Sequence, residues 1–229
     1  MSVVMIDYPI ILLNLKTYEL SMGQKAIDFA RIAERVNEKT GICIAITPQT
    51  IDIPAVTVSS ETLVFAQHMD PVSYGKYTGH TLPEALAEAG VYGTLLNHSE
   101  HQIPIEVIEA SIKRAREVDL VTVVCADKVE TAKKIALLEP DAIAIEPPEL
   151  IGSGISVSSA QPEIVSGSVS AVQSINSNVK VLCGAGITNG DDASSALKLG
   201  AKGILVASGV VKASDPYKAL LELARAMQR

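Results

Sequence analysis

The chain has 229 residues, 48% of them hydrophobic, with no Trp and a formal net charge of −7 at pH 7. This length suits one large domain or two small ones, and the composition allows a sizeable core built from aliphatic side chains. A net negative charge without a basic run argues against nucleic acid as a partner.

The cysteines and the N-terminal residues indicate a cellular compartment. Cys43, Cys125 and Cys183 are widely separated, and each lies inside an apolar run. Their odd number and spacing fit neither a zinc site nor a redox pair, so we expect buried free thiols in a reduced compartment. The first residues carry no positive segment, and no apolar stretch reaches membrane-spanning length. The sequence therefore predicts a cytoplasmic protein without a membrane partner.

Eight short apolar runs of strand length recur along the chain at a steady interval. They cover residues 10–13, 42–46, 63–66, 93–96, 120–125, 142–145, 179–183 and 203–206. The runs are continuously apolar rather than alternating, which is typical of parallel strands buried on both faces.

Segments with helical periodicity lie between these runs. Apolar residues at three- and four-residue steps predict helices over 24–36, 105–115, 129–138, 163–175, 191–199 and 217–227, and shorter, weaker ones over 51–59 and 82–89. Gly90 and Gly200 suit the left-handed position that closes a helix, and Gly93 and Gly203 would open the following strands.

Eight βα units over this length predict a single (β/α)8 TIM barrel that spans residues 1–229. The alternative is an open doubly wound sheet, which commonly carries a Gly-x-Gly-x-x-Gly motif after its first strand. No such motif follows residues 10–13, and the βα alternation has no interruption that would mark a second domain. We therefore favour the barrel.

In a barrel, the catalytic groups lie at the carboxyl ends of the strands. The first strand is followed by Asn14 and Lys16, the fourth by His98 and Glu100, and the sixth by Glu146. The two prolines after Glu146 hold its backbone extended, and a carboxylate that ends a buried strand is costly unless it is used or paired. Glu146 is therefore the candidate base.

The last two strands are followed by loops of small residues. Gly184 and Gly186 follow the seventh strand, and Ala207 and Ser208 follow the eighth. Small residues let backbone N–H groups approach an oxyanion, and phosphate sites in this fold commonly occupy these loops.

Together these groups suit proton abstraction next to a carbonyl on a phosphorylated substrate. No metal cluster, nucleotide motif or cysteine nucleophile is evident. The residues therefore predict a cofactor-independent isomerase or lyase that acts on a small sugar phosphate. An apolar segment and a Gly-Ser-Gly stretch after the prolines, residues 149–154, resemble a lid.

Each candidate also has a purely structural interpretation. Lys16 could be a surface lysine, and His98 a hydrogen-bonded core histidine. Glu100 could be a charge at a helix N-terminus that Ser99 caps, which is the favoured interpretation for that residue taken alone.

Two further interpretations concern glycines and histidines. Gly184 and Gly186 could be turn glycines. His68 and His80 suit structural or exposed positions better than catalytic ones.

At these residues the chain resembles the triosephosphate isomerase family, in its compact archaeal form. The resemblance covers nearly the whole chain and rests on Asn14-Leu15-Lys16, Ala66-Gln67, Tyr77-Thr78-Gly79-His80, Asn97-His98-Ser99-Glu100, residues 146–154, Cys183-Gly184-Ala185-Gly186-Ile187 and Ala207-Ser208-Gly209. It implies interconversion of dihydroxyacetone phosphate and glyceraldehyde 3-phosphate in a (β/α)8 barrel, with a carboxylate base and a neutral histidine.

The resemblance also implies residue roles. Glu146 would move the carbon-bound proton, neutral His98 would polarise the carbonyl, Lys16 would offset negative charge and Asn14 would position substrate oxygens. Backbone amides around Ile151, Gly186, Ala207 and Ser208 would bind the phosphate, and residues 147–153 would close over it. Glu100 resembles the second carboxylate of the family, near Lys16.

Thr78 matches a loop that reaches into the site of a neighbouring subunit in this family. This implies at least a homodimer, and the archaeal form often assembles into tetramers. Two departures concern the longer bacterial and eukaryotic form. His101-Gln102 stands where that form usually has an arginine, and Pro148-Glu149 stands where it has the lid tryptophan.

Two rival functions would share parts of this pattern. Another phosphate-binding barrel, such as a sugar-phosphate lyase, epimerase or prenyl-transfer barrel, would share the glycine loops without requiring Glu146, His98 and Lys16 together. A non-catalytic phosphosugar-binding protein could retain the whole barrel.

Overall fold

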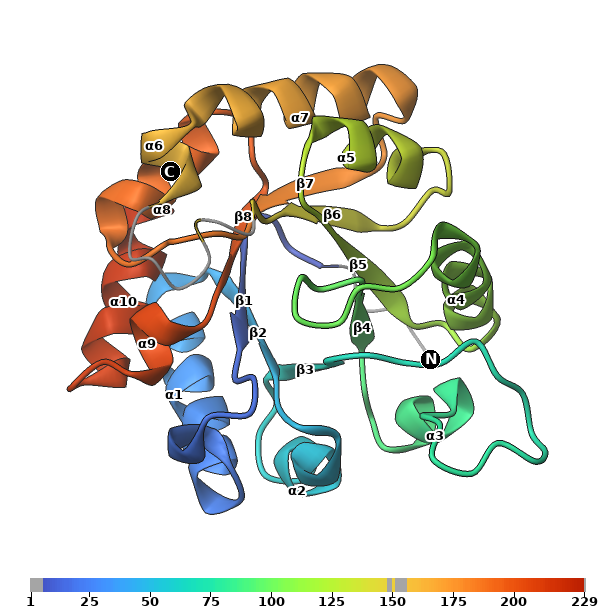
Figure 1. The fold of residues 1–229 in the computed structure, drawn as a ribbon. Coiled ribbons are helices and arrows are strands. Elements are labelled where there is room, and N and C mark those ends of the chain that lie inside the picture. The colour runs from blue at the N-terminus through green and yellow to red at the C-terminus, as the bar shows by residue number, and fades with distance from the viewer. Residues whose placement is uncertain (1–5, 148–149, 151–155, 229) are drawn as a thin grey trace.

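A closed barrel of parallel strands forms the centre of the protein. The computed structural model describes residues 6–147, 150 and 156–228. Within these ranges each strand pairs with the next along the chain, and β8 pairs with β1 (Figure 1). The strands are β1 Ile10–Asn14, β2 Cys43–Thr47, β3 Leu63–Ala66, β4 Gly93–Leu96, β5 Val121–Ala126, β6 Ala142–Ile145, β7 Lys180–Cys183 and β8 Gly203–Val206. The predicted barrel is confirmed, and the open doubly wound sheet is excluded because no strand edge is left unpaired in this part of the chain.

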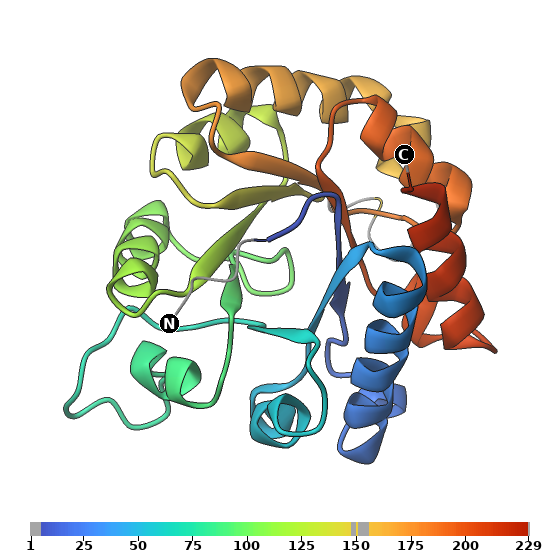
Figure 2. The same ribbon diagram turned by 180° about the vertical axis from the view of Figure 1, so that it is seen from behind.

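The helices surround the barrel, as the view from behind shows (Figure 2). The α-helices that the structure describes are α1 Gln24–Thr40, α2 Ile53–Thr57, α3 Pro83–Glu88, α4 Ile105–Glu117, α5 Val129–Ala136, α6 Val157–Ala160, α7 Pro162–Ile175, α8 Gly190–Lys198, α9 Ser208–Val211 and α10 Pro216–Ala226. Two 3-10 turns, η1 Glu19–Ser21 and η2 Thr50–Asp52, accompany them. Every predicted helix is present, and α2 and α3 are short, as expected. The single turns η1, α6 and α9 were not predicted because one turn leaves no periodicity in the sequence.

The expected glycine positions are confirmed. Gly90 and Gly200 close their helices with φ of 81° and 100°, in the left-handed region. Gly93 and Gly203 open β4 and β8. At Gly203 a Cβ atom would lie 2.3 Å from the carbonyl oxygen of Ile10 in the neighbouring strand, so only glycine fits there.

Two apolar layers hold the barrel together, and the alternation along each strand separates them. The interior is filled by Ile10, Leu12, Ala45, Phe65, Leu95, Val123, Cys125, Ala142, Ala144, Leu182 and Leu205. The intervening residues, such as Ile11 and Leu13 of β1, pack outward with the helices. The same alternation directs Asn14 and Glu146 toward the barrel axis, because each lies two residues beyond an interior side chain.

The three cysteines are free thiols. Cys125 and Cys183 are buried, as predicted. Cys43 is only half-buried because it is the first residue of β2, at the end of the barrel where the strands begin. None of the described helices combines the length and apolar character needed to cross a bilayer.

Candidate active site

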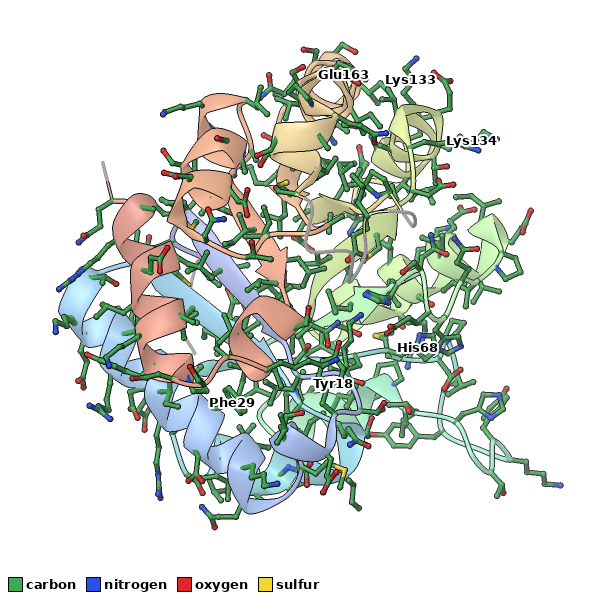
Figure 3. All side chains as sticks on the ribbon, turned by 60° about the vertical axis from the view of Figure 1, so that its left-hand side comes forward. Tyr18, Phe29, His68, Lys133, Lys134 and Glu163 are labelled. Carbon is green, nitrogen blue, oxygen red and sulfur yellow. The ribbon has the colours of Figure 1, made fainter. Side chains whose placement is uncertain are left out.

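A pocket lies at the carboxyl ends of the strands, where residues of five βα units meet. Most of the predicted site residues line it: Asn14, Lys16, His98, Glu146, Gly184, Gly186, Ala207 and Ser208. Tyr18, which follows β1 and is labelled in Figure 3, also lines the pocket, together with Ile187 and Thr188. The structure therefore brings together residues that are up to 194 positions apart in the chain, from Asn14 to Ser208.

Glu146 lies directly after β6 and is only 3% exposed. Its backbone N–H donates to the carbonyl oxygen of Ala126 at 2.8 Å, which extends the strand pairing by one residue and fixes the Cα position. Its Oε1 atom is 3.5 Å from Nε2 of His98. The carboxylate is therefore buried, directed into the pocket and close to a second titratable group.

Gly184 makes room for this carboxylate. A Cβ atom at position 184 would lie 2.6 Å from Cγ of Glu146 and 3.2 Å from its Cδ. The interpretation of Gly184 as an ordinary turn glycine is therefore wrong, because the side chain of Glu146 occupies the space that a larger residue would need.

Cys125, on the neighbouring strand β5, adds to the apolar surroundings of Glu146. Burial, and then the charge of the Glu146 carboxylate, raise the pKa of the Cys125 thiol well above its usual range. The thiol is therefore neutral at physiological pH. It therefore places no second negative charge beside the carboxylate of Glu146.

A hydrogen bond from the backbone fixes the orientation and tautomer of the His98 ring. The ring is 7% exposed, and its Nδ1 atom accepts the backbone N–H of Glu100 at 3.2 Å. A ring nitrogen that accepts a hydrogen bond carries no proton, so the proton of the neutral ring lies on Nε2, which faces the pocket and Glu146. His98 therefore presents a hydrogen-bond donor to the pocket.

Asn97 explains how His98 reaches this position. Its φ of 57° is left-handed, so the alternation of β4 ends there and the chain turns. The side chain braces this turn, because Nδ2 donates to the carbonyl oxygen of Cys125 at 2.9 Å and Oδ1 accepts the N–H of Ile103 at 3.0 Å.

Lys16 lies in the pocket wall with a side chain only 11% exposed, so its interpretation as a surface lysine is wrong. Its Nζ atom is 2.9 Å from Oε1 of Glu100. Its backbone is left-handed, with φ of 48°. Two side chains hold that conformation: Oδ1 of Asn14 accepts the N–H of Lys16, and Nε2 of Gln67 donates to its carbonyl oxygen, each at 2.9 Å.

Glu100 is not a helix N-terminal charge, and Ser99 is not a helix cap. Helix α4 begins at Ile105 with Pro104 at its N-cap, so Glu100 lies in the turn that precedes the helix. The left-handed Asn97 starts this turn and the proline delays the helix. Glu100 instead supplies its carboxylate to Lys16 and its backbone N–H to His98.

The loops after β7 and β8 form the opposite wall of the pocket. Gly186 has φ of 71°, a left-handed conformation that favours glycine. The first turn of α9 begins at Ser208, so its leading N–H groups have no partner inside the helix. The two loops touch closely, because a Cβ atom at Gly209 would lie 2.8 Å from the carbonyl oxygen of Ile187.

Several predicted residues do not lie in this pocket. Ile151 and residues 148–149 and 152–154 lie outside the described residues. Thr78 lies in the exposed loop between β3 and α3, away from the pocket of its own chain. His80 is exposed, and half-buried His68 packs against His101, with 4.4 Å between ring centroids and an angle of 45° between the ring planes.

Sequence reasoning missed Tyr18, Thr188 and the role of Gln67. Tyr18 and Thr188 lie two residues beyond Lys16 and Gly186. Both could have been predicted by including two more residues after each of these strands. Gln67 directly follows β3, and its position after a buried strand is the signal that the other site residues share.

The sequence and the fold are similar to those of known proteins. Residues 9–227 match the family model described as triosephosphate isomerase. The chain is 54% identical over 217 residues to the triosephosphate isomerase of Methanosarcina acetivorans, covering 95% of this chain and 98% of the relative. It is 49% identical over 214 residues to that of Methanocaldococcus jannaschii, covering 93% and 98%. Its fold is similar to the crystal structure of triosephosphate isomerase from Bartonella henselae, with a TM-score of 0.78, 16% identity and coverage of 96% of this chain and 99% of that one.

Proposed function

The chain belongs to the triosephosphate isomerase family and interconverts dihydroxyacetone phosphate and D-glyceraldehyde 3-phosphate, and we propose that Glu146, His98, Lys16 and Asn14 carry out this reaction. One observation carries the assignment. The buried carboxylate of Glu146 lies 3.5 Å from Nε2 of a neutral His98, in a pocket whose opposite wall is built from small-residue loops. A base and a hydrogen-bond donor are therefore placed side by side.

Glu146 acts as the base. Its carboxylate removes a proton from the hydroxymethyl carbon of dihydroxyacetone phosphate, and the electrons of that C–H bond form the carbon–carbon double bond of an enediolate. The protonated carboxyl group then returns the proton to the neighbouring carbon, which gives the aldehyde. Because the same carboxyl group removes the proton from one carbon and returns it to the other, the reaction balances without a metal or redox cofactor.

His98 stabilises the charge that develops on the carbonyl oxygen. Its Nε2–H donates a hydrogen bond to that oxygen, and the same proton can pass between the two enediolate oxygens. A neutral donor suits this exchange because its acidity lies closer to that of the enediol than an imidazolium's does. The N–H of Glu100 on Nδ1 keeps the ring in this form.

Lys16 and Asn14 supply charge and orientation. The ammonium of Lys16 lies on the pocket wall and offsets the negative charge of the phosphate and of the enediolate. Asn14 holds the backbone of Lys16 and accepts the hydroxyl of Thr47 at 3.1 Å, so its amide group is fixed at the substrate's edge. Glu100 pairs with Lys16 and keeps its ammonium in place.

The phosphate binds at the loops after β7 and β8. Gly186, Ala207 and Ser208 line this side of the pocket, and the first turn of α9 directs N–H groups toward an anion. The family resemblance adds the amide of Ile151 and closure of residues 147–153 over the bound substrate. Gly184 supports the site by leaving space for Glu146.

The active form is a homo-oligomer in the cytoplasm, and the enzyme serves glycolysis and gluconeogenesis. The loop that carries Thr78 is exposed and bears two apolar side chains in water, Tyr74 and Tyr77. Next to the active-site pocket lies a second hollow, whose lining includes Lys16, Gln67 and Glu100. We place the Thr78 loop of a second copy there, which makes a dimer the smallest assembly, and pairs of dimers form a tetramer.

A coupled assay of the purified protein tests the function. Conversion of glyceraldehyde 3-phosphate to dihydroxyacetone phosphate is followed through the oxidation of NADH by glycerol-3-phosphate dehydrogenase. The isomerase assignment requires turnover in both directions. A protein that binds triose phosphates without turnover would be the non-catalytic phosphosugar-binding barrel instead.

A further inference from the structure

A second buried carboxylate, Asp192, lies near the pocket but does not line it. The residue is in the first turn of α8 and is only 7% exposed. A buried carboxylate is costly unless hydrogen bonds satisfy it, so the partners of Asp192 show what it holds in place.

One oxygen of Asp192 holds the phosphate-side loop. Its Oδ2 atom accepts the backbone N–H of Thr188 at 3.0 Å and the hydroxyl of Thr188 at 3.1 Å. Thr188 lines the pocket in the same loop as Gly186 and Ile187. Two hydrogen bonds to an ionised acceptor therefore fix the end of the loop that the proposed function assigns to the phosphate.

The rest of Asp192 fixes the other side of this loop. Its Oδ1 accepts the hydroxyl of Ser159 at 3.2 Å, and its backbone carbonyl oxygen accepts the hydroxyl of Ser158 at 3.0 Å. Helix α6, which carries both serines, is also tied to the loop directly, because the N–H of Val157 donates to the carbonyl oxygen of Ala185 at 3.1 Å. The loop is therefore clamped between α6 and α8.

A simple capping role does not account for this arrangement. The N-cap of α8 is Asn189, whose Oδ1 accepts the N–H of Asp192 at 3.0 Å. In a capping box the carboxylate at the position of Asp192 would bond the N–H of the N-cap residue. Asp192 instead reaches the preceding residue, Thr188. Asp191 has the same charge beside the same helix terminus, but it is exposed.

We propose that Asp192 is a positioning residue for the substrate's phosphate, because it holds the loop of residues 184–188 in the conformation that binds the phosphate. This inference rests on the proposed function and adds a residue to it. Asp192 touches no substrate. Its effect is therefore on the binding of the phosphate and not on the proton transfer itself.

The test compares two substrates in Asp192→Asn, which keeps the size of the side chain but places an N–H₂ group or a weaker acceptor against the Thr188 donors. We expect the KM for glyceraldehyde 3-phosphate to rise about tenfold, the factor that corresponds to about 1.4 kcal/mol. We expect the slow isomerisation of glyceraldehyde, which lacks the phosphate, to stay within about twofold of wild type because remote binding contacts do not assist it. Asp191→Asn is the matched control and should leave both substrates at wild-type values.

Two results overturn the proposal. One is an equal loss with both substrates, which would mean that Asp192 only stabilises the fold. The other is a wild-type KM for glyceraldehyde 3-phosphate. If Asp192→Asn does not fold, Thr188→Val and Ser159→Ala each remove one hydroxyl that donates to Asp192. The proposal then requires that Thr188→Val raise the KM for glyceraldehyde 3-phosphate, by a smaller factor, and leave glyceraldehyde unaffected.

Binding of inorganic phosphate separates this proposal from the proposed function. We expect Asp192→Asn to bind inorganic phosphate about tenfold more weakly than wild type in a calorimetric titration. Equal binding by the two proteins would contradict the positioning role, even with an active isomerase. Wild-type protein that binds phosphate but lacks triose-phosphate turnover would contradict the proposed function alone.

Discussion

The side chain of Glu146 fills the space beside the Cα atom of Gly184, where any added Cβ would lie 2.6 Å from Cγ of the glutamate. Strands β6 and β7 run side by side at this point, and the N–H of Gly184 donates to the carbonyl oxygen of Ile145 at 2.9 Å. Neither backbone can therefore move away easily. The position of the proposed base therefore depends on the absence of a Cβ atom at Gly184, the residue that follows β7.

Gly184→Ala should displace the carboxylate of Glu146. A misplacement of about 1 Å can cost on the order of 100-fold in rate, so we expect kcat to fall by about 10- to 100-fold. The coupled isomerase assay measures this change, with circular dichroism to confirm folding. Gly167→Ala is the control: it lies inside α7, where a Cβ has 3.7 Å to its nearest neighbour, and it should leave kcat unchanged. A wild-type kcat for Gly184→Ala would contradict the described packing.

Lys16→Met should slow the reaction, because it removes the positive charge of the ammonium group while nearly keeping the length of the side chain. We expect kcat/KM to fall by at least about 100-fold, since lost electrostatic stabilisation of the transition state typically costs about 3 kcal/mol. Lys113→Met is the matched control, because Lys113 pairs with Glu109 on an exposed face of α4. A similar kcat/KM for the two variants would mean that Lys16 has no catalytic role.

Much of the fold could be predicted because each strand is a largely apolar run, and most of these runs are followed by a polar residue. The prediction failed by one residue where polar groups are buried: β2 extends to Thr47, which lies opposite Asn14 and donates its hydroxyl to it. Hydrophobicity cannot indicate such a pair. The single turns α6 and α9 were missed because four residues show no helical period.

The site could be predicted where strand ends determine it, as for Glu146. The positions of site residues could not be predicted where the backbone conformation of a loop determines them. Glu100 was assigned to a helix start because the sequence does not show that Asn97 is left-handed, although asparagine tolerates that region better than most residues. The contact between Thr188 and Asp192 could not be predicted either, because it only arises once the loop after β7 is folded.

Thr78→Arg should prevent assembly of the proposed homo-oligomer. An arginine at the exposed loop cannot enter a hollow next to Lys16 without placing two positive charges together, so we expect a monomer with at least about tenfold lower kcat/KM. Light scattering after size-exclusion chromatography measures the mass. Ser177→Arg, an exposed turn residue before β7, should keep the wild-type mass. An unchanged mass for Thr78→Arg would place the subunit contact elsewhere.

Stability should fall at alkaline pH through the half-buried Cys43. Burial raises the pKa of its thiol from 9.0 to about 11, so the folded state binds this proton more tightly than the unfolded state does. The resulting stability is complete below pH 9 and is lost as the pH rises toward 11, on the order of 2 kcal/mol. Urea unfolding at pH 8, 9.5 and 11 measures this loss.

Cys43→Ala serves as the comparison for this pH dependence. It removes the titrating thiol, so its free energy of unfolding should fall less between pH 8 and 11 than that of the wild type. Parallel curves for the two proteins would show that other groups, such as the hydroxyl of half-buried Tyr8, whose pKa is also raised by partial burial, account for the loss.

The central claim is that Glu146 transfers the proton, and the rate of Glu146→Gln tests it most directly. Glutamine keeps the shape of the side chain but cannot accept the proton, so kcat for triose-phosphate isomerisation should fall by at least about 1,000-fold, within the range of general-base catalysis. Affinity for inorganic phosphate, measured on the same protein, should stay at the wild-type value because the phosphate loops are untouched. Isomerisation by Glu146→Gln at the wild-type rate would show that another residue is the base.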